Sequence, residues 1–74
     1  MNKKPNKTIT IFNFLLNETP SYSTWIIWDG RWRVAVFYID DEDLWMRWFP
    51  NKHMNKIVKS YDYDEDTKQG NIYY

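Results

Sequence analysis

The chain divides into short apolar runs that are rich in aromatic and β-branched residues. Polar segments containing Gly, Pro, Asn or Asp separate these runs. Such runs are typical of β-strands, because these side chains pack well on a pleated surface. Their regular spacing is typical of a small antiparallel sheet or barrel. We therefore predict a mainly β domain of five or six strands. The predicted strands cover residues 8–16, 22–28, 31–39, 44–49, 57–63 and 71–74.

The strongest local signal is the dipeptide Asp29-Gly30 between two apolar runs. Asp-Gly suits the positive φ angles of a type I′ turn, so it predicts a two-residue hairpin loop. This turn would place Trp28 opposite Arg31 and Trp25 opposite Val34, and it would divide the hairpin into two faces. The predicted core face carries Trp25, Ile27, Trp32, Val34, Val36 and Tyr38, and the opposite face carries Ile26, Trp28, Arg31, Arg33, Ala35 and Phe37.

Residues 41–49 fit either a strand or a short helix. In the β interpretation, residues 40–43 form a loop before the strand at 44–49. In the α interpretation, Asp40 caps a helix whose acidic first turn suits the helix dipole. The alternative fold class is therefore α+β, with a short helix at 41–49. That helix would gather its apolar residues on one stripe, namely Leu44, Trp45, Trp48 and Phe49.

A chain of 74 residues forms one domain, which we expect to span residues 1–74 with residues 1–7 frayed. A domain of this size usually needs a disulfide or a metal ion to stabilise it. The chain has no Cys, so its five Trp, six Tyr and four Phe residues are expected to supply buried area instead. This count fits a monomer, and a homodimer that buries surplus Trp is the alternative.

Reactive side chains are scarce in this sequence. No Cys is present, and the one histidine, His53, lies in a polar segment between lysines. This composition excludes thiol nucleophiles and thiolate or multi-histidine metal sites. We expect His53 to be an exposed loop residue, because no sequence neighbour would orient it as a general base. The prediction is a protein that is not an enzyme and has no cofactor, metal site or catalytic residue.

The formal net charge of zero hides two oppositely charged halves. Residues 1–39 carry five basic and two acidic side chains, whereas residues 40–74 carry five basic and eight acidic ones. The acidic residues form two clusters, and fixed negative charge attracts a basic partner surface, including a groove built for nucleic acid. The clusters are Asp40, Asp41, Glu42 and Asp43, and Asp62, Asp64, Glu65 and Asp66.

Aromatic and cationic side chains meet near the predicted hairpin tip. Trp28, Arg31 and Arg33 would share one sheet face, and Trp and Arg are enriched among residues that dominate binding energy. The same groups also suit the stacking of single-stranded bases. We expect this face and the two acidic clusters to contact a partner, with Trp28 or Trp45 as the anchor.

These features predict a small protein-binding module that inhibits or modulates a protein with a basic, nucleic-acid-handling surface. Short length, a residue composition that AT-rich codons encode and missing catalytic groups are typical of phage or mobile-element anti-defence proteins of the anti-CRISPR kind. A domain that binds single-stranded nucleic acid and a self-associating structural domain are the alternatives. No apolar run is long enough to span a membrane, so we expect no membrane partner and a cytoplasmic location.

Overall fold

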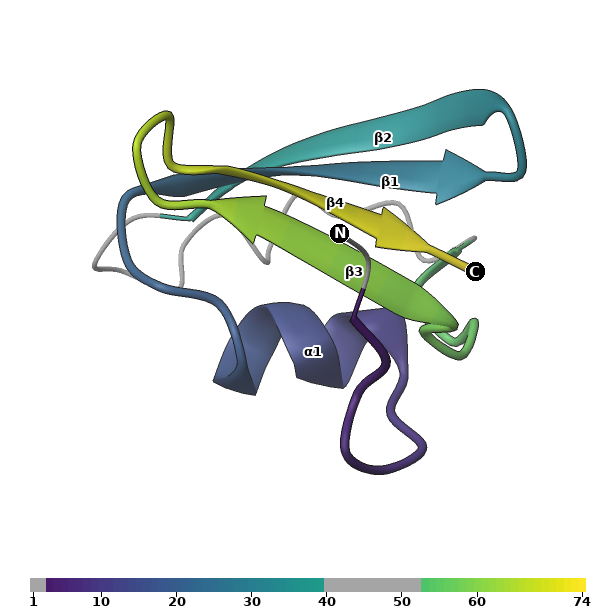
Figure 1. The fold of residues 1–74 in the computed structure, drawn as a ribbon. Coiled ribbons are helices and arrows are strands. Elements are labelled where there is room, and N and C mark those ends of the chain that lie inside the picture. The colour runs from purple at the N-terminus through teal and green to yellow at the C-terminus, as the bar shows by residue number, and fades with distance from the viewer. Residues whose placement is uncertain (1–2, 40–52) are drawn as a thin grey trace.

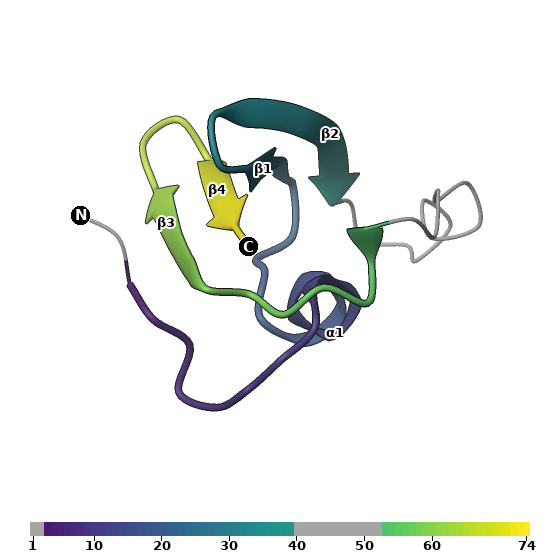
Figure 2. The same ribbon diagram turned by 90° about the vertical axis from the view of Figure 1, so that its right-hand side faces the viewer.

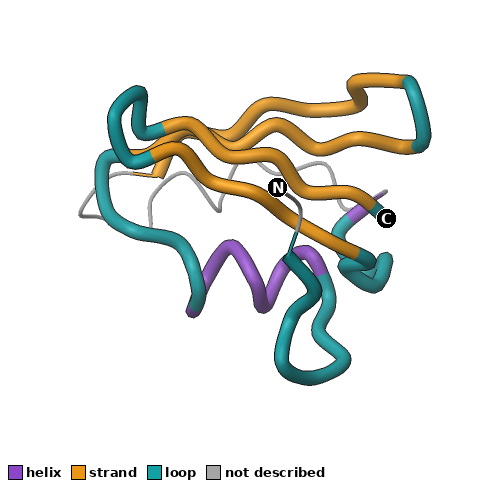
Figure 3. Tube along the Cα trace, in the orientation of Figure 1, coloured by secondary structure: helices purple, strands orange, loops and turns teal. Residues whose placement is uncertain are grey.

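The computed structural model describes residues 3–39 and 53–74, which form one sheet and one helix (Figure 1). The described strands number four, in the order β2-β1-β4-β3, and the helix lies against one face of the sheet (Figure 3). The mainly β prediction is confirmed, but the predicted five or six strands are wrong for this part of the chain. The predicted strand 44–49 and the alternative helix 41–49 lie outside the described residues. The elements are α1 Ile11–Asn17, β1 Ser23–Asp29, β2 Trp32–Ile39, β3 Ser60–Asp64 and β4 Gln69–Tyr73.

Residues 8–16, predicted to be a strand, instead contain most of the helix α1. Thr10 is its N-cap, and the Thr10 hydroxyl accepts a hydrogen bond of 3.2 Å from the backbone N–H of Asn13. The buried residues of the helix are Ile11, Phe14 and Leu15. Their spacing of three and four residues belongs to a helix, and burial of this stripe outweighs the strand preference of the residue types.

The loop between β1 and β2 lies one residue later than predicted. Asp29 pairs with Trp32, so the two loop residues are Gly30 and Arg31. Gly30 has a φ of 60°, and a glycine with positive φ at the first loop position is typical of a type II′ turn. The hairpin itself is therefore confirmed, whereas the predicted type I′ turn over Asp29-Gly30 is wrong.

A β-bulge shifts β2 further relative to β1. Trp28 pairs with Arg33 whereas Ile27 pairs with Ala35, so Val34 is the extra residue. Neither predicted pair forms, and much of β2 turns its other face to the core. Trp25 and Ile27 are buried as predicted. Trp32 and Tyr38, which were predicted to be in the core, are exposed, and Val36 pairs with Ile26 on the face away from the core. Ala35 and Phe37, which were predicted on the opposite face, pack against the core instead.

The C-terminal strand β4 lies inside the sheet, between β1 and β3. It pairs antiparallel with β3 but parallel with β1, so the wholly antiparallel prediction is wrong at this pair. Gly70 of β4 lies next to Trp25 of β1, and its missing side chain lets the Trp25 indole lie over β4. The indole then stacks on the Tyr63 ring of β3, with ring centroids 5.4 Å apart.

The predicted strand 57–63 corresponds to β3, which begins three residues later. Tyr61 and Tyr63 pack against the core, whereas Ile57 is exposed and bridges to Thr10. Lys3, within the segment expected to be frayed, exchanges two backbone hydrogen bonds with Tyr61. The N-terminal segment thus pairs with the outer edge of β3 at this point.

The hydrophobic core lies between α1 and the sheet. At its centre, the Phe14 ring meets the Trp25 ring edge-on at 5.5 Å and the Tyr61 ring at 4.9 Å. The Trp25 indole N–H donates to the Ser23 hydroxyl at 2.8 Å, so its burial leaves no unpaired donor. The buried apolar residues are Ile9, Ile11, Phe14, Leu15, Trp25, Ile27, Ile39, Met54, Val58 and Ile72. One face of the sheet is therefore taken up by the core.

Candidate functional site

The other face of the sheet, which we call the outer face, points away from α1 (Figure 2). Side chains alternate along each strand, so the register of the four strands shows which residues share this face. The outer face carries Thr24, Ile26 and Trp28 from β1, Arg33, Val36 and Tyr38 from β2, Ser60, Asp62 and Asp64 from β3, and Gln69, Asn71 and Tyr73 from β4.

A hydrogen-bonded chain of side chains crosses three strands of the outer face. The Trp28 indole N–H donates to the side-chain amide oxygen Oδ1 of Asn71 at 2.8 Å. The Asn71 amide group in turn donates to the Asp62 carboxylate at 2.8 Å. This chain fixes the side-chain positions of all three residues, so the outer face presents an ordered surface.

Tyr73 extends this network with a second ring. Its hydroxyl donates to the other carboxylate oxygen of Asp62 at 3.3 Å, and its ring stacks beside Trp28 with centroids 6.5 Å apart. Burial raises the pKa of the Tyr73 hydroxyl above its ordinary value of 10.0, and the charge and hydrogen bond of Asp62 raise it further. The Tyr73 hydroxyl is therefore a proton donor at neutral pH.

This raised pKa predicts that the protein loses stability in alkali. The folded protein keeps the Tyr73 proton at pH values where the unfolded chain releases it, so the free energy of unfolding falls as the pH rises above about 10. Chemical denaturation at a series of pH values measures this fall. We expect Tyr73→Phe to make the fall shallower, and Asp62→Asn to do so by a smaller amount. An alkaline fall of equal size in Tyr73→Phe and wild type would contradict this assignment.

The outer face is apolar along the inner strand β1 and charged on both edge strands. Ile26 of β1 pairs with Val36 of β2, and Trp28 lies two residues further along the same face of β1. Arg33 lies on the β2 side, and Asp62 lies on the β3 side. An apolar centre with a polar rim is the usual anatomy of a protein–protein interface.

The structure gives the residues of the second acidic cluster different roles. Asp62 belongs to the network on the outer face. Asp64 caps the β3–β4 turn, because its carboxylate accepts hydrogen bonds from the backbone N–H groups of Asp66 at 2.9 Å and Thr67 at 3.5 Å. Glu65 and Asp66 are exposed in this turn. The cluster therefore combines a structural turn with one carboxylate that accepts hydrogen bonds from Asn71 and Tyr73.

The other residues predicted to bind a partner are not all brought together. Trp28 and Arg33 pair on the outer face, whereas Arg31 belongs to the hairpin loop. The β3–β4 turn lies at the opposite end of the sheet from this loop, because Thr24 at the start of β1 pairs with Gln69. The remaining predicted residues, Asp40, Asp41, Glu42, Asp43 and Trp45, lie outside the described part of the chain.

Among the outer-face residues that were not predicted to belong to the site, Tyr38, Asn71 and Tyr73 bear on its chemistry. The predicted hairpin register placed Tyr38 in the core, but it is 70 % exposed. Asn71 and Tyr73 lie in a short terminal strand whose neighbours the sequence does not reveal. The available signal was alternation in residues 69–73, where Gly70 and Ile72 are buried and their neighbours are not.

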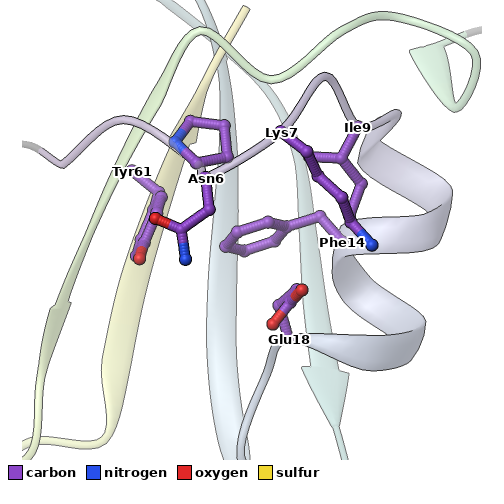
Figure 4. A pocket seen from close by; sticks show the side chains of 7 residues that line it. Asn6, Lys7, Ile9, Phe14, Glu18 and Tyr61 are labelled. Carbon is purple, nitrogen blue, oxygen red and sulfur yellow. The ribbon is translucent and has the colours of Figure 1, made fainter.

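A pocket of about 290 Å³ opens between the N-terminal segment, α1 and β3 (Figure 4). The rings of Phe14 and Tyr61 line its apolar part, and the Lys7 ammonium, the Glu18 carboxylate and the Asn6 amide lie around it. These three polar residues are exposed. Phe14 therefore separates the core from a small opening with a polar rim.

His53 is not the exposed loop residue that the sequence predicts. It is half-buried, and its Nδ1 atom lies 2.8 Å from the Tyr74 hydroxyl. Burial, and then the charge of Asp29, raise the pKa of the Tyr74 hydroxyl. The hydroxyl is therefore protonated at neutral pH, and it donates to the ring nitrogen when His53 is neutral. This contact connects Tyr74, the residue after β4, to the segment that begins at His53.

No group of three His, Asp or Glu side chains in residues 3–39 and 53–74 is placed to hold a metal ion. None of the helices described in these ranges is long and apolar enough to cross a membrane. Comparison of the chain with models of protein families, with curated proteins and with solved structures finds no match. The functional argument therefore rests on the chemistry of the outer face.

Proposed function

We propose that this protein is a non-enzymatic protein-binding module that contacts its partner through the outer face. The observation that carries the proposal is the ordered group of Trp28, Asn71, Asp62 and Tyr73 on a sheet face that the described helix does not cover. Trp, Tyr and Arg dominate the energetics of protein interfaces. Because strands and hydrogen bonds hold these side chains, binding would cost little additional ordering entropy.

The charges on the outer face favour a protein partner over single-stranded nucleic acid. A surface that binds single strands places cations along the phosphate backbone beside its stacking aromatics. Here Asp62 lies within hydrogen-bond distance of Tyr73, and Asp64 lies on the same side of the sheet. Two carboxylates beside the aromatic rings would repel phosphates, so a nucleic-acid platform is the weaker proposal.

The acidic side of the outer face favours a partner with a basic surface. Asp62 and Asp64 lie there, and Glu65 and Asp66 continue the negative charge into the adjoining turn. Such a charge distribution steers association with a basic surface and raises the association rate. A protein that handles nucleic acid presents such a surface, and a module bound to it would inhibit its function. Our proposal includes this inhibitory role, of the kind that phage and mobile-element anti-defence proteins perform.

The test compares two double variants in quantitative affinity capture from lysates of candidate host cells. Arg33→Ser with Tyr38→Ser removes one cation and one exposed ring from the outer face. We expect this variant to lower the affinity for the captured partner at least about tenfold, because Tyr and Arg are enriched among the interface residues whose truncation costs about 2 kcal/mol or more. The captured partner is identified by mass spectrometry, and its affinity is then measured with purified protein.

The matched control is Lys56→Ser with Ile57→Ser, which removes one cation and one exposed apolar residue away from the outer face. We expect wild-type affinity for this variant. Equal loss in both double variants, or no loss in either, would contradict the proposal. Sedimentation at a series of concentrations tests self-association, and a dimer that Tyr38→Ser dissociates would favour the structural alternative.

A further inference from the structure

The Asp62 carboxylate is a half-buried negative charge whose hydrogen-bond donors are both uncharged. Its donors are the Asn71 amide and the Tyr73 hydroxyl. None of the cationic side chains in the described ranges pairs with it. We propose that Asp62 and the rings of Trp28 and Tyr73 form a receptor for an arginine side chain of the partner. This inference rests on the proposed function, because it names the chemistry that the outer face recognises.

Asp62 retains the capacity to accept further hydrogen bonds. An ionised carboxylate offers about four lone-pair sites on its two oxygen atoms. Asn71 uses a site on one oxygen, and Tyr73 uses a site on the other. Each oxygen of Asp62 therefore keeps one free site, which suits the paired N–H groups of a guanidinium. The two existing bonds also hold the carboxylate in place, so little side-chain freedom would be lost on binding.

The Tyr73 ring next to Asp62, and the Trp28 ring that stacks with it, supply aromatic surface for the same ligand. The planes of these two rings are inclined by 17°, and their centroids lie 6.5 Å apart. A guanidinium is planar and weakly hydrated, so it stacks on aromatic faces while it donates hydrogen bonds at its edge. A lysine ammonium has no flat face and is strongly hydrated. The combination of aromatic surface and carboxylate therefore favours arginine over lysine.

Arg33, the arginine that the described strands carry on the outer face, lies too far away to fill the site. Arg33 is on β2, and β1 and β4 separate β2 from Asp62 on β3. Strands lie about 4.8 Å apart, so three strand steps amount to roughly 14 Å. A single arginine side chain does not cross that distance. Arg33 is therefore not the ligand, and the proposal assigns the arginine to the partner.

The hydrogen bond between Asn71 of β4 and Asp62 of β3 does not require a charge on Asp62. A neutral amide at this position would still accept the hydrogen bond from Asn71 through its carbonyl oxygen. A partly buried carboxylate loses part of its hydration, and this loss costs more free energy than the same burial of a neutral amide. The charge is therefore better explained by a cationic ligand than by the fold.

The experiment titrates the protein with three short peptides that are identical except at one position, which is Arg, Lys or citrulline. The reporter is the NMR resonance of the Trp28 indole N–H, whose acceptor Asn71 is bonded to Asp62. Trp28→Phe identifies this resonance by its disappearance. We expect a saturable shift with the Arg peptide, at least threefold weaker binding of the Lys peptide, and no saturation with citrulline. Equal responses to Arg and citrulline would overturn the inference.

Two variants with the same change in net charge complete the test. Asp62→Asn removes the charge within the site, and Glu18→Gln removes an exposed charge at the C-terminal end of α1, away from the outer face. We expect at least fivefold weaker Arg-peptide binding for Asp62→Asn and wild-type binding for Glu18→Gln. Equal weakening in both variants would show non-specific attraction and overturn the site. The comparison of peptides on wild-type protein remains decisive should Asp62→Asn not fold.

The two proposals fail in different ways. A partner that is captured through Arg33 and Tyr38, combined with peptides that do not discriminate arginine, overturns the arginine site and leaves the protein-binding proposal intact. The opposite result is specific Arg-peptide binding together with unchanged partner capture by the Arg33 and Tyr38 double variant. That result overturns only the wider docking surface.

Discussion

Gly70→Ala is expected to destabilise the protein by about 3 kcal/mol, near the upper end of the usual cost of overpacking a core. A Cβ atom at position 70 would overlap the Trp25 ring carbons Cζ3, Cε3 and Cη2. The indole has little room to move, because it stacks on Tyr63 and its N–H donates to Ser23. A domain of this length has a total stability of roughly 4–11 kcal/mol, so the loss is a large fraction of it.

Urea denaturation followed by Trp fluorescence measures this loss. The control is Gly30→Ala in the hairpin loop, where a Cβ atom would meet no neighbour within 4 Å but the φ is 60°. We expect a cost of about 1 kcal/mol there, from backbone strain alone. Trp25→Phe removes the ring that would overlap the new methyl group, so adding Gly70→Ala to that variant is expected to cost less than adding it to wild type. Equal costs in both backgrounds would contradict the steric explanation.

The hairpin shows how far local sequence patterns determine this fold. Turn residues between two apolar runs were sufficient to predict that β1 and β2 pair. They were not sufficient for the register, because both the loop at Gly30 and the bulge at Val34 shift the pairing. A bulge depends on how the strand packs as a whole, and no residue of β2 marks its position. The face assignment of Tyr38 failed for this reason.

The predictions for the first apolar segment and for the last strand were wrong for different reasons. The sequence shows the helical spacing of Ile11, Phe14 and Leu15 and the capping residue Thr10. The prediction of a strand gave more weight to the β-branched and aromatic residue types of this segment. For β4, the sequence contains no local sign that it inserts between β1 and β3, because pairing partners are set by packing over long sequence distances.

The candidate site depends on the part of the fold that the sequence did not reveal. Residue types alone singled out Trp28, Arg33 and Asp62, and the structure places all three on the outer face. The connection between Trp28 and Asp62 runs through Asn71, and it exists only because β4 lies between their strands. Sequence reasoning could therefore identify binding chemistry but not the network that orders it.

Phe14→Ala is expected to be the most destabilising single truncation in α1, with a loss of about 3–5 kcal/mol in the free energy of unfolding. The Phe14 ring is 2 % exposed and lies between the Trp25 and Tyr61 rings, so its removal ends two aromatic contacts at the centre of the core. The loss is a large fraction of the roughly 4–11 kcal/mol expected for a domain of this size. A large fall of the denaturation midpoint is therefore expected, measurable by circular dichroism.

Phe12→Ala is the matched control, because it makes the same chemical change in the same helix at a partly buried position. We expect it to cost less than half as much, since less of its surface is removed from water. The pocket beside Phe14 provides a second test of the mechanism. Its floor would open into the core of Phe14→Ala, so a small apolar molecule such as benzene is expected to restore part of the stability of this variant and not of Phe12→Ala. Equal destabilisation by the two truncations would show that Phe14 is not the centre of the core.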